Sequence, residues 1–227
     1  MNLRSPQRRL LLFPLSDEVH FPLTELRLHV LRHDYCGMVR DLHRREGSRG
    51  QLGIVLLKPD WPGGGAPPVY AAGTAARLMG LAELDDGCEI VLRGEFRFEL
   101  EKEVSGHLGR EALVRPVTEP SLSEQDPDVL HLRQEILQRT SRLSEELGNR
   151  FDLGADEMRD LSGDLTFEAM VNHLAANMEM SPVRKLQLLR HTVSERALHL
   201  LTILRSRQQV LDVLRPYRHL AADAERN

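Results

Sequence analysis

Residues 90–100 read IVLRGEFRFEL and have the clearest strand pattern in the chain. From Glu95 onward, polar and apolar residues alternate, so one face of this strand is expected to be buried and the other wet. Gly94 lies where the alternation changes phase, which predicts a bulge or a bend. The preceding Asp85-Asp86-Gly87 is typical of a hairpin turn, because glycine tolerates the positive φ that such turns need.

Five other apolar runs in the first half of the chain have the length of strands and are bounded by glycine and proline. With the stretch above they give six predicted strands, at residues 10–15, 26–31, 51–57, 69–78, 89–100 and 111–117. One helix, roughly residues 34–46, interrupts them, because its apolar residues recur at helical spacing. Six short strands with one helix predict a curled sheet or a partly open barrel.

The chain becomes helical after Pro120. Residues 123–126 resemble a capping box with Asp in place of Glu, and they predict a helix that runs to about Leu147. Ser181-Pro182 places a capping residue before a proline at the first helical position, and residues 192–195 form a full capping box. Residues 148–164 are acidic and interrupted by glycines, which predicts a loop.

Two apolar stripes predict the buried faces of these helices. One is at helical spacing on a second helix and comprises Phe167, Met170, Val171, Leu174 and Met178. The other lies on the last helix and comprises Ala197, Leu200, Leu201, Leu204, Leu211 and Leu214. Core packing is the favoured interpretation of both stripes, and docking of a partner helix is the alternative for residues 200–204.

Composition and charge exclude several classes of protein. The chain has 227 residues, of which 41% are hydrophobic, and a net charge of −4. Residues 1–117 carry 16 basic and 16 acidic side chains, so a nucleic-acid partner is disfavoured. The N-terminal apolar run is too short for a signal peptide, and no stretch reaches the ~20 apolar residues of a membrane span. We expect a cytoplasmic protein with both cysteines, Cys36 and Cys88, reduced.

Three side chains have a spacing that metal ligands use, namely His29, His33 and Cys36. Because His29 is expected in a strand and a fourth ligand is lacking, no metal site is predicted. Cys36 could act as a nucleophile if a histidine activated it, but a small buried residue near a helix start is the better interpretation. No catalytic residue and no cofactor are predicted.

The loop of residues 58–68 reads KPDWPGGGAPP and carries the only tryptophan, Trp61. Large aromatic residues in glycine-rich loops often anchor a partner, and folding back on the barrel is an equal alternative. Tyr70, just past the loop, could join either arrangement. We take Arg32, His33, Tyr35, Trp61 and Tyr70 as candidate protein-binding residues.

Several segments, in this order and spacing, resemble the N-terminal substrate-recognition domain of the ATP-dependent protease Lon. They are LLLFPL (10–15), VHFP (19–22), AGTAARL (72–78), LDDG (84–87), RGEFRF (93–98), VRPV (114–117) and LAANM (174–178). The resemblance implies an α+β fold, in which a PUA-like β pseudo-barrel with one helix (residues 8–118) is followed by a C-terminal α-helical bundle (119–216). Residues 217–227 are expected to be a disordered tail.

The resemblance also implies a non-enzymatic module that binds polypeptide substrates or serves as an adaptor for a protease or chaperone partner. No Gly-Lys pair exists for a phosphate-binding loop, and the protease's Ser-Lys dyad belongs to a domain this chain lacks. The chain ends about where Lon begins its ATPase, so a free-standing domain is expected. Oligomerisation is left open. An RNA-binding PUA-like protein is the alternative function, because PUA-like folds elsewhere bind RNA.

Overall fold

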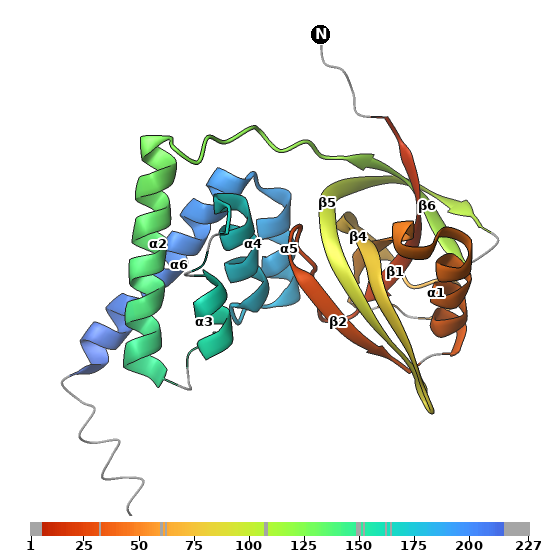
Figure 1. Cartoon of the computed structure of the whole chain (residues 1–227), viewed down its shortest axis with the longest axis horizontal. Helices are drawn as coiled ribbons and strands as arrows, with labels where there is room; N and C mark the ends of the chain where they lie inside the picture. The colour runs from red at the N-terminus through yellow and green to blue at the C-terminus, as the bar shows by residue number, and fades with distance from the viewer. Residues whose placement is uncertain are drawn as a thin grey trace, which may run out of the picture. The chain divides into compact units, whose positions relative to one another are not determined.

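The computed structural model describes residues 6–31, 33–59, 61, 63–106, 109–148, 151, 153–161, 163 and 165–215. The chain divides into two compact units. The first comprises Met1–Pro120 with Glu179–Thr192 and contains the sheet, and the second comprises Ser121–Met178 with Val193–Asn227 and is helical (Figure 1). Arg32 and residues 217–227 of the predicted tail lie outside the described residues.

The first unit contains all six predicted strands and the predicted helix. Two strands run further than expected. β4 continues to Leu84 because the hairpin keeps its pairing up to Leu84 opposite Gly87, and β5 continues to Ser105 because it pairs with β6 up to Ser105 opposite Arg110. The elements are β1 (Arg8–Leu15), β2 (Glu25–Val30), α1 (His33–Glu46), the 3₁₀ turn η1 (Gly47–Arg49), β3 (Gln51–Leu57), β4 (Val69–Leu84), β5 (Gly87–Ser105), β6 (Arg110–Pro116) and α5 (Pro182–Arg190).

The strands form one six-stranded sheet in the order β2-β5-β4-β3-β1-β6. Among the described strands β1 and β3 run parallel, and the other pairings are antiparallel. A further pairing between β5 and β6 curls the sheet into a partly closed barrel, since the second half of β5 takes β6 while its first half takes β2 (Figure 1).

The bend predicted at Gly94 is confirmed. Ala76 lies opposite Gly94 while Ala75 lies opposite Phe96, so Glu95 is the extra residue of a bulge. The backbone of Gly94 bonds to the segment before β2, through Leu23 N–H to Gly94 O and Gly94 N–H to Thr24 O, both at 2.9 Å. A Cβ at position 94 would lie 2.2 Å from the carbonyl oxygen of Phe21, so only glycine allows this approach.

The alternation along β1 divides its side chains between two cores. Leu11 and Phe13 pack with α1, whereas Leu10 and Leu12 pack on the opposite face with Phe98. Successive side chains of a strand point to opposite faces, so a strand that is covered on both faces contributes to two cores.

Helix α5 packs on β4 in the first unit, although the sequence boundaries of 119–216 placed it with the helical domain. Buried Arg97 of β5 donates from Nη1 to the carbonyl of Leu189 at 2.9 Å and also pairs with Glu119. Lys185 lies 3.9 Å from Glu18. These contacts join segments far apart in the chain, which no local pattern could indicate.

The second unit contains the helices α2 (Pro127–Leu147), α3 (Ala155–Leu161), α4 (Phe167–Asn177) and α6 (Val193–Leu214). Helices α2 and α4 both pack on α6. The whole stripe predicted on the second helix is buried, as are Ala197, Leu200, Leu201 and Leu204 of α6. At the end of α6 the prediction is wrong, since Leu214 is exposed.

Two local predictions for the helical segments need correction. The N-cap of α2 is Asp126, whose carboxylate accepts from Asp128 N–H, and not Ser123. Proline at position 127 favours this later start, because it fits the first helical turn. The acidic segment predicted as a loop contains helix α3. The cap predicted at Ser181 is confirmed by its bond from Arg184 N–H.

Candidate functional site

The sheet leaves two strand edges open near the start of the chain. β1 pairs with β3 along Leu11–Leu15 but with β6 only along Arg8–Leu11. β2 pairs with β5 alone, so among the described residues one side of β2 and one side of the second half of β1 have no neighbouring strand. Unpaired strand edges offer backbone donors and acceptors to another chain.

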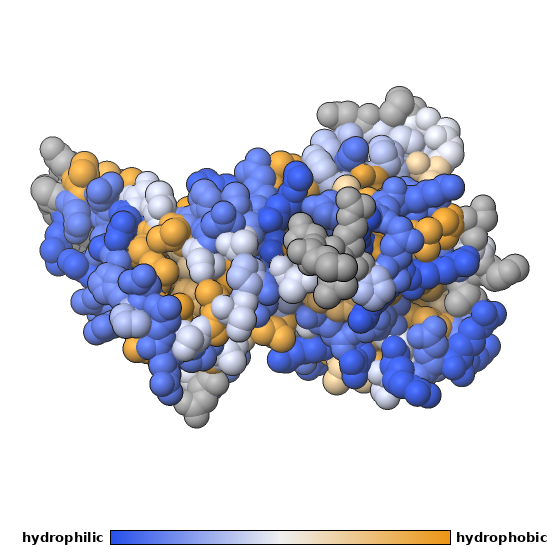
Figure 2. All heavy atoms as spheres, turned by 90° about the horizontal axis from the view of Figure 1, so that it is seen from above, coloured by the Kyte–Doolittle hydropathy of each residue, from blue (hydrophilic) through white to orange (hydrophobic). Residues whose placement is uncertain are grey.

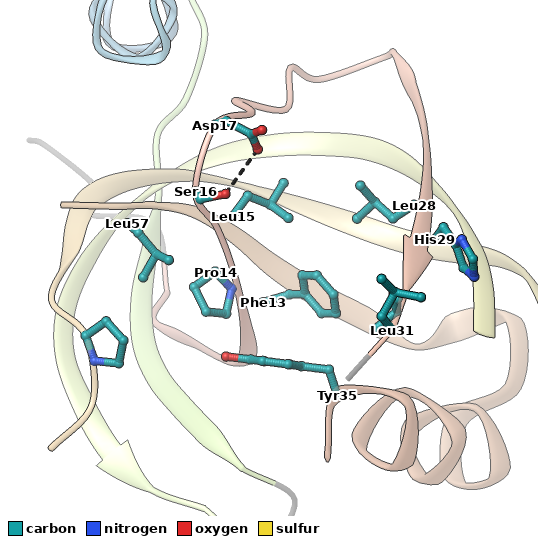
Figure 3. Close-up of a pocket in the computed structure, with 12 residues that line it drawn as sticks. Phe13, Pro14, Leu15, Ser16, Asp17, Leu28, His29, Leu31, Tyr35 and Leu57 are labelled. Carbon is teal, nitrogen blue, oxygen red and sulfur yellow. Dashed lines mark hydrogen bonds between the residues drawn. The ribbon is translucent and has the colours of Figure 1, made fainter. Parts of the chain in front are cut away.

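A groove with a volume of about 360 Å³ lies between these two edges. Figure 3 shows Phe13, Leu15 and Leu28 converging on it from β1 and β2, with Tyr35 of α1 beneath them. Its lining is mainly apolar and comprises Phe13, Pro14, Leu15, Ser16, Asp17, Leu28, His29, Val30, Leu31, Tyr35, Leu57 and Pro67. An open apolar hollow of this size is typical of a binding site.

An aromatic pair forms the floor of the groove. The rings of Phe13 and Tyr35 lie 5.2 Å apart between centroids, tilted by 52°. Phe13 is buried on the face of β1 that packs against α1, while Tyr35 is half-buried in the first turn of that helix. The buried ring of Phe13 is therefore held by its packing, while the ring of Tyr35 stays partly open to a ligand.

Apart from the Tyr35 hydroxyl, the polar side chains of the described lining lie at the ends of the groove. The Ser16 hydroxyl donates to Asp17 at 3.2 Å, which leaves the exposed Asp17 carboxylate at one end. At the other end the His29 ring points away from Phe13, and its Nε2 lies 3.2 Å from Asp86 (Figure 3). No arginine or lysine is among the described residues that line the groove.

The face of the molecule seen in Figure 2 is mostly hydrophilic, with apolar atoms in separate patches. At the groove the exposed apolar side chain is Leu31, which is 60% exposed. Met79 of β4 is 58% exposed but does not line the groove. Single exposed apolar residues are ordinary, whereas one beside an apolar hollow extends a binding surface.

The structure brings one of the five candidate residues into the groove, namely Tyr35. His33 begins α1, but its side chain, like all of Arg32, lies outside what the structure describes. Trp61 is 42% exposed in the loop between β3 and β4. Tyr70 lies at the start of β4, where the Lys58 ammonium is 5.8 Å from its ring centroid.

Sequence reasoning selected none of the apolar strand residues of the groove, which include Phe13, Leu28 and the neighbouring Leu31. Their apolar character was read as strand pattern, and the meeting of β1 with β2 depends on pairings remote in sequence. Pro67 is a partial exception, because it belongs to the loop selected for Trp61 and its carbonyl accepts from Arg110 Nη1 at 2.6 Å.

The two cysteines and the turn aspartates have surroundings that indicate structural positions. Cys36 and Cys88 are buried, and burial together with the neighbouring Cys36 thiol raises the pKa of Cys88 to about 12. Asp85 and Asp86, predicted as turn residues, form the turn of the β4–β5 hairpin. Within the part of the chain that the structure describes, no group of three His, Cys, Asp or Glu side chains could hold a metal ion.

The family model of the ATP-dependent protease La (LON) substrate-binding domain matches residues 9–206. The chain belongs to this family. Its Lon-type α+β fold agrees with the prediction, and the chain is a substrate-recognition module of the Lon type. The Lon substrate-binding domain is itself non-catalytic. No curated protein matches the chain.

Two solved structures share the fold. The N-terminal domain of a Mycobacterium avium complex Lon protease is 18% identical, with a TM-score of 0.67 over 87% of this chain and 98% of that one. A Lon N-terminal domain protein from Xanthomonas campestris is 25% identical, with a TM-score of 0.59 over 86% and 98%. Across the described ranges, no helix is long and apolar enough to cross a membrane.

Proposed function

We propose that the groove between β1 and β2 binds extended segments of polypeptide, and that the protein is a non-enzymatic recognition module or protease adaptor. The observation that supports this most is an apolar groove flanked by two strand edges that lack a neighbouring strand among the described residues. Membership of a substrate-binding family agrees with it. In this proposal the protein works in the cytoplasm.

Strand addition to β2 is the binding mode that suits this geometry. An added strand bonds through its backbone, which is independent of sequence, and places alternate side chains on one face. Leu28 and Val30 of β2 share the face toward the groove, while Arg27 and His29 alternate with them. Pro14 lacks an N–H, so β1 is the poorer template and we place the added strand on β2.

The composition of the groove favours polypeptide over RNA. Among the described lining residues Asp17 is the one anionic side chain, and this lining contains none of the arginine or lysine side chains with which proteins neutralise a phosphate backbone. An extended peptide with apolar side chains at alternate positions meets the aromatic floor and needs no such charge. A cationic residue at the end of the peptide would lie near Asp17.

Fluorescence anisotropy with a labelled, permanently unfolded protein tests this proposal. Leu31→Asp would place a carboxylate beside the apolar groove and should weaken binding about tenfold or more. Met79→Asp is the matched control, because Met79 has the same exposure outside the groove, and it should bind within about twofold of the wild type. Equal weakening by both variants, or no binding by the wild type, would contradict the proposal.

The other candidate residues can be placed by the same assay. Trp61 and Tyr70 do not line the groove, and we propose them as a second contact for the chain that leaves it. Trp61→Ala should then weaken the binding of long unfolded chains and leave the binding of short peptides unchanged. The adaptor role predicts that adding the protein changes the rate at which a Lon-type protease degrades a bound substrate, and that Leu31→Asp removes this effect.

A further inference from the structure

Two cysteines that play no part in the groove chemistry lie in direct contact beneath its wall. Cys36, in the first turns of α1, and Cys88, at the start of β5, are 52 positions apart in sequence. Their sulfur atoms are 2.7 Å apart, with the Cys88 thiol donating to Cys36 Sγ. Both are free thiols and both are buried. A disulfide bond is about 2.05 Å long, so a small closing motion separates this pair from one.

The surroundings hold the two sulfurs in place from three elements. The Cys36 thiol donates to the carbonyl of Val30 at 3.0 Å, and Val30 lies opposite Cys88 in the β2–β5 pairing. Val30 and Tyr35, which adjoin this contact, both line the groove. A bond between the sulfurs would therefore link α1 covalently to the start of β5, and it would remove the thiol hydrogen that Cys36 donates to Val30 at the end of β2.

We propose that Cys36 and Cys88 are an oxidative modification site, at which peroxide converts the thiol pair into a reversible intramolecular disulfide. This goes beyond polypeptide binding and does not depend on it. Disulfides in reducing compartments are usually transient and redox-sensing, and a buried pair already in contact fits that use.

The reaction balances with one molecule of hydrogen peroxide. Peroxide first oxidises one thiol to a sulfenic acid and releases a water molecule. The second sulfur then attacks the oxidised one, so the S–S bond forms, the S–O bond breaks, and the hydroxyl leaves with the second thiol's proton as water. We place the first step at Cys36, because the Cys88 thiol donates its hydrogen to Cys36 Sγ, and burial raises the pKa of Cys88.

Peroxide treatment of the whole folded protein is the first test. We expect the two thiols to disappear together, the mass to fall by two hydrogen atoms, and digestion to yield a Cys36–Cys88 peptide that dithiothreitol separates. Cys36→Ser and Cys88→Ser should each lose this product. Independent oxidation of the two sulfurs to sulfinic acid in the wild type, without the cross-linked peptide, would overturn the proposal.

A second measurement needs no variant, so it stands even if the substitutions prevent folding. The disulfide is equilibrated with mixtures of reduced and oxidised glutathione, once in the native chain and once in urea. Closing a loop of this length favours the disulfide in the folded chain by up to about a thousandfold relative to the unfolded chain. A native chain that forms the disulfide no more readily than the unfolded one would show that the fold opposes the bond.

Discussion

Arg97 should be among the most costly side chains to remove from the first unit. It lies on β5 with 5% of its surface exposed, donates to the carbonyl of Leu189 in α5, and pairs with Glu119 beyond β6. Replacing it by methionine keeps most of the volume but removes the cation that pairs with the Glu119 carboxylate. Removing one partner of a buried ion pair costs about 3–5 kcal/mol, because the remaining charge stays desolvated.

Urea denaturation followed by circular dichroism would measure this loss. With a denaturant slope of about 2–3 kcal/mol/M for a chain of this size, Arg97→Met should lower the midpoint of the urea transition by roughly 1–2.5 M. Arg93→Met on the same strand is the matched control, since Arg93 is exposed and its loss should cost within about 0.5 kcal/mol.

The double variant Arg97→Met/Glu119→Gln identifies the source of the cost. If the cost comes from the buried charge of Glu119, removing that charge should restore part of the free energy of unfolding. The losses caused by the two substitutions should then not be additive. Hydrogen exchange should also rise in α5 before the rest of the unit, because the anchor of Leu189 is lost. A single Arg97→Met variant that loses less than about 1 kcal/mol would refute the reasoning from burial.

Two further predictions concern stability. Burial lowers the pKa of His20 to about 4, whereas the same side chain in the unfolded chain binds a proton near pH 6.5. The contribution of His20 to the free energy of unfolding should therefore be complete above pH 6.5. It should fall by about 3 kcal/mol as the pH drops to 4. His20→Gln should flatten this slope in urea titrations, and an unchanged slope would assign it to other groups. Leu204→Ala should cost about 2–5 kcal/mol because Leu204 is fully buried in α6, whereas the exposed Leu198→Ala should cost under about 0.5 kcal/mol; equal thermal shifts for both would contradict the packing of that helix face.

The elements of the fold could be predicted because their causes are local. The Asp85-Asp86-Gly87 turn and the cap at Ser181 each act within a few residues, and the structure contains both. The alternation after Glu95 correctly predicted a strand, but its prediction of one wet face is wrong, because Arg97 on that face is buried against Leu189 and Glu119. Local reasoning failed where two local causes competed. Proline at position 127 moved the start of α2 past Ser123, and the glycine-rich acidic segment still formed α3.

The candidate site could be predicted only in part. Tyr35 was selected, and the structure places it in the groove, but Phe13 and Leu28 were missed because apolar residues on strands look alike before their partners are known. Trp61 was selected for its loop, and the groove lies elsewhere. Which strand edges remain open depends on the order β2-β5-β4-β3-β1-β6, and that order arises from pairings between segments remote in sequence.

Periodicity, capping residues and turn chemistry in the chain thus settled which segments become strands or helices and which family they resemble, because these preferences act over one or two turns of backbone. The tertiary structure alone decided that α5 joins the sheet unit through Arg97, that β1 and β2 frame a groove, and that Cys36 meets Cys88. Each of these is a contact between residues dozens of positions apart, and it forms only when the whole sheet selects its pairing and buries its apolar faces.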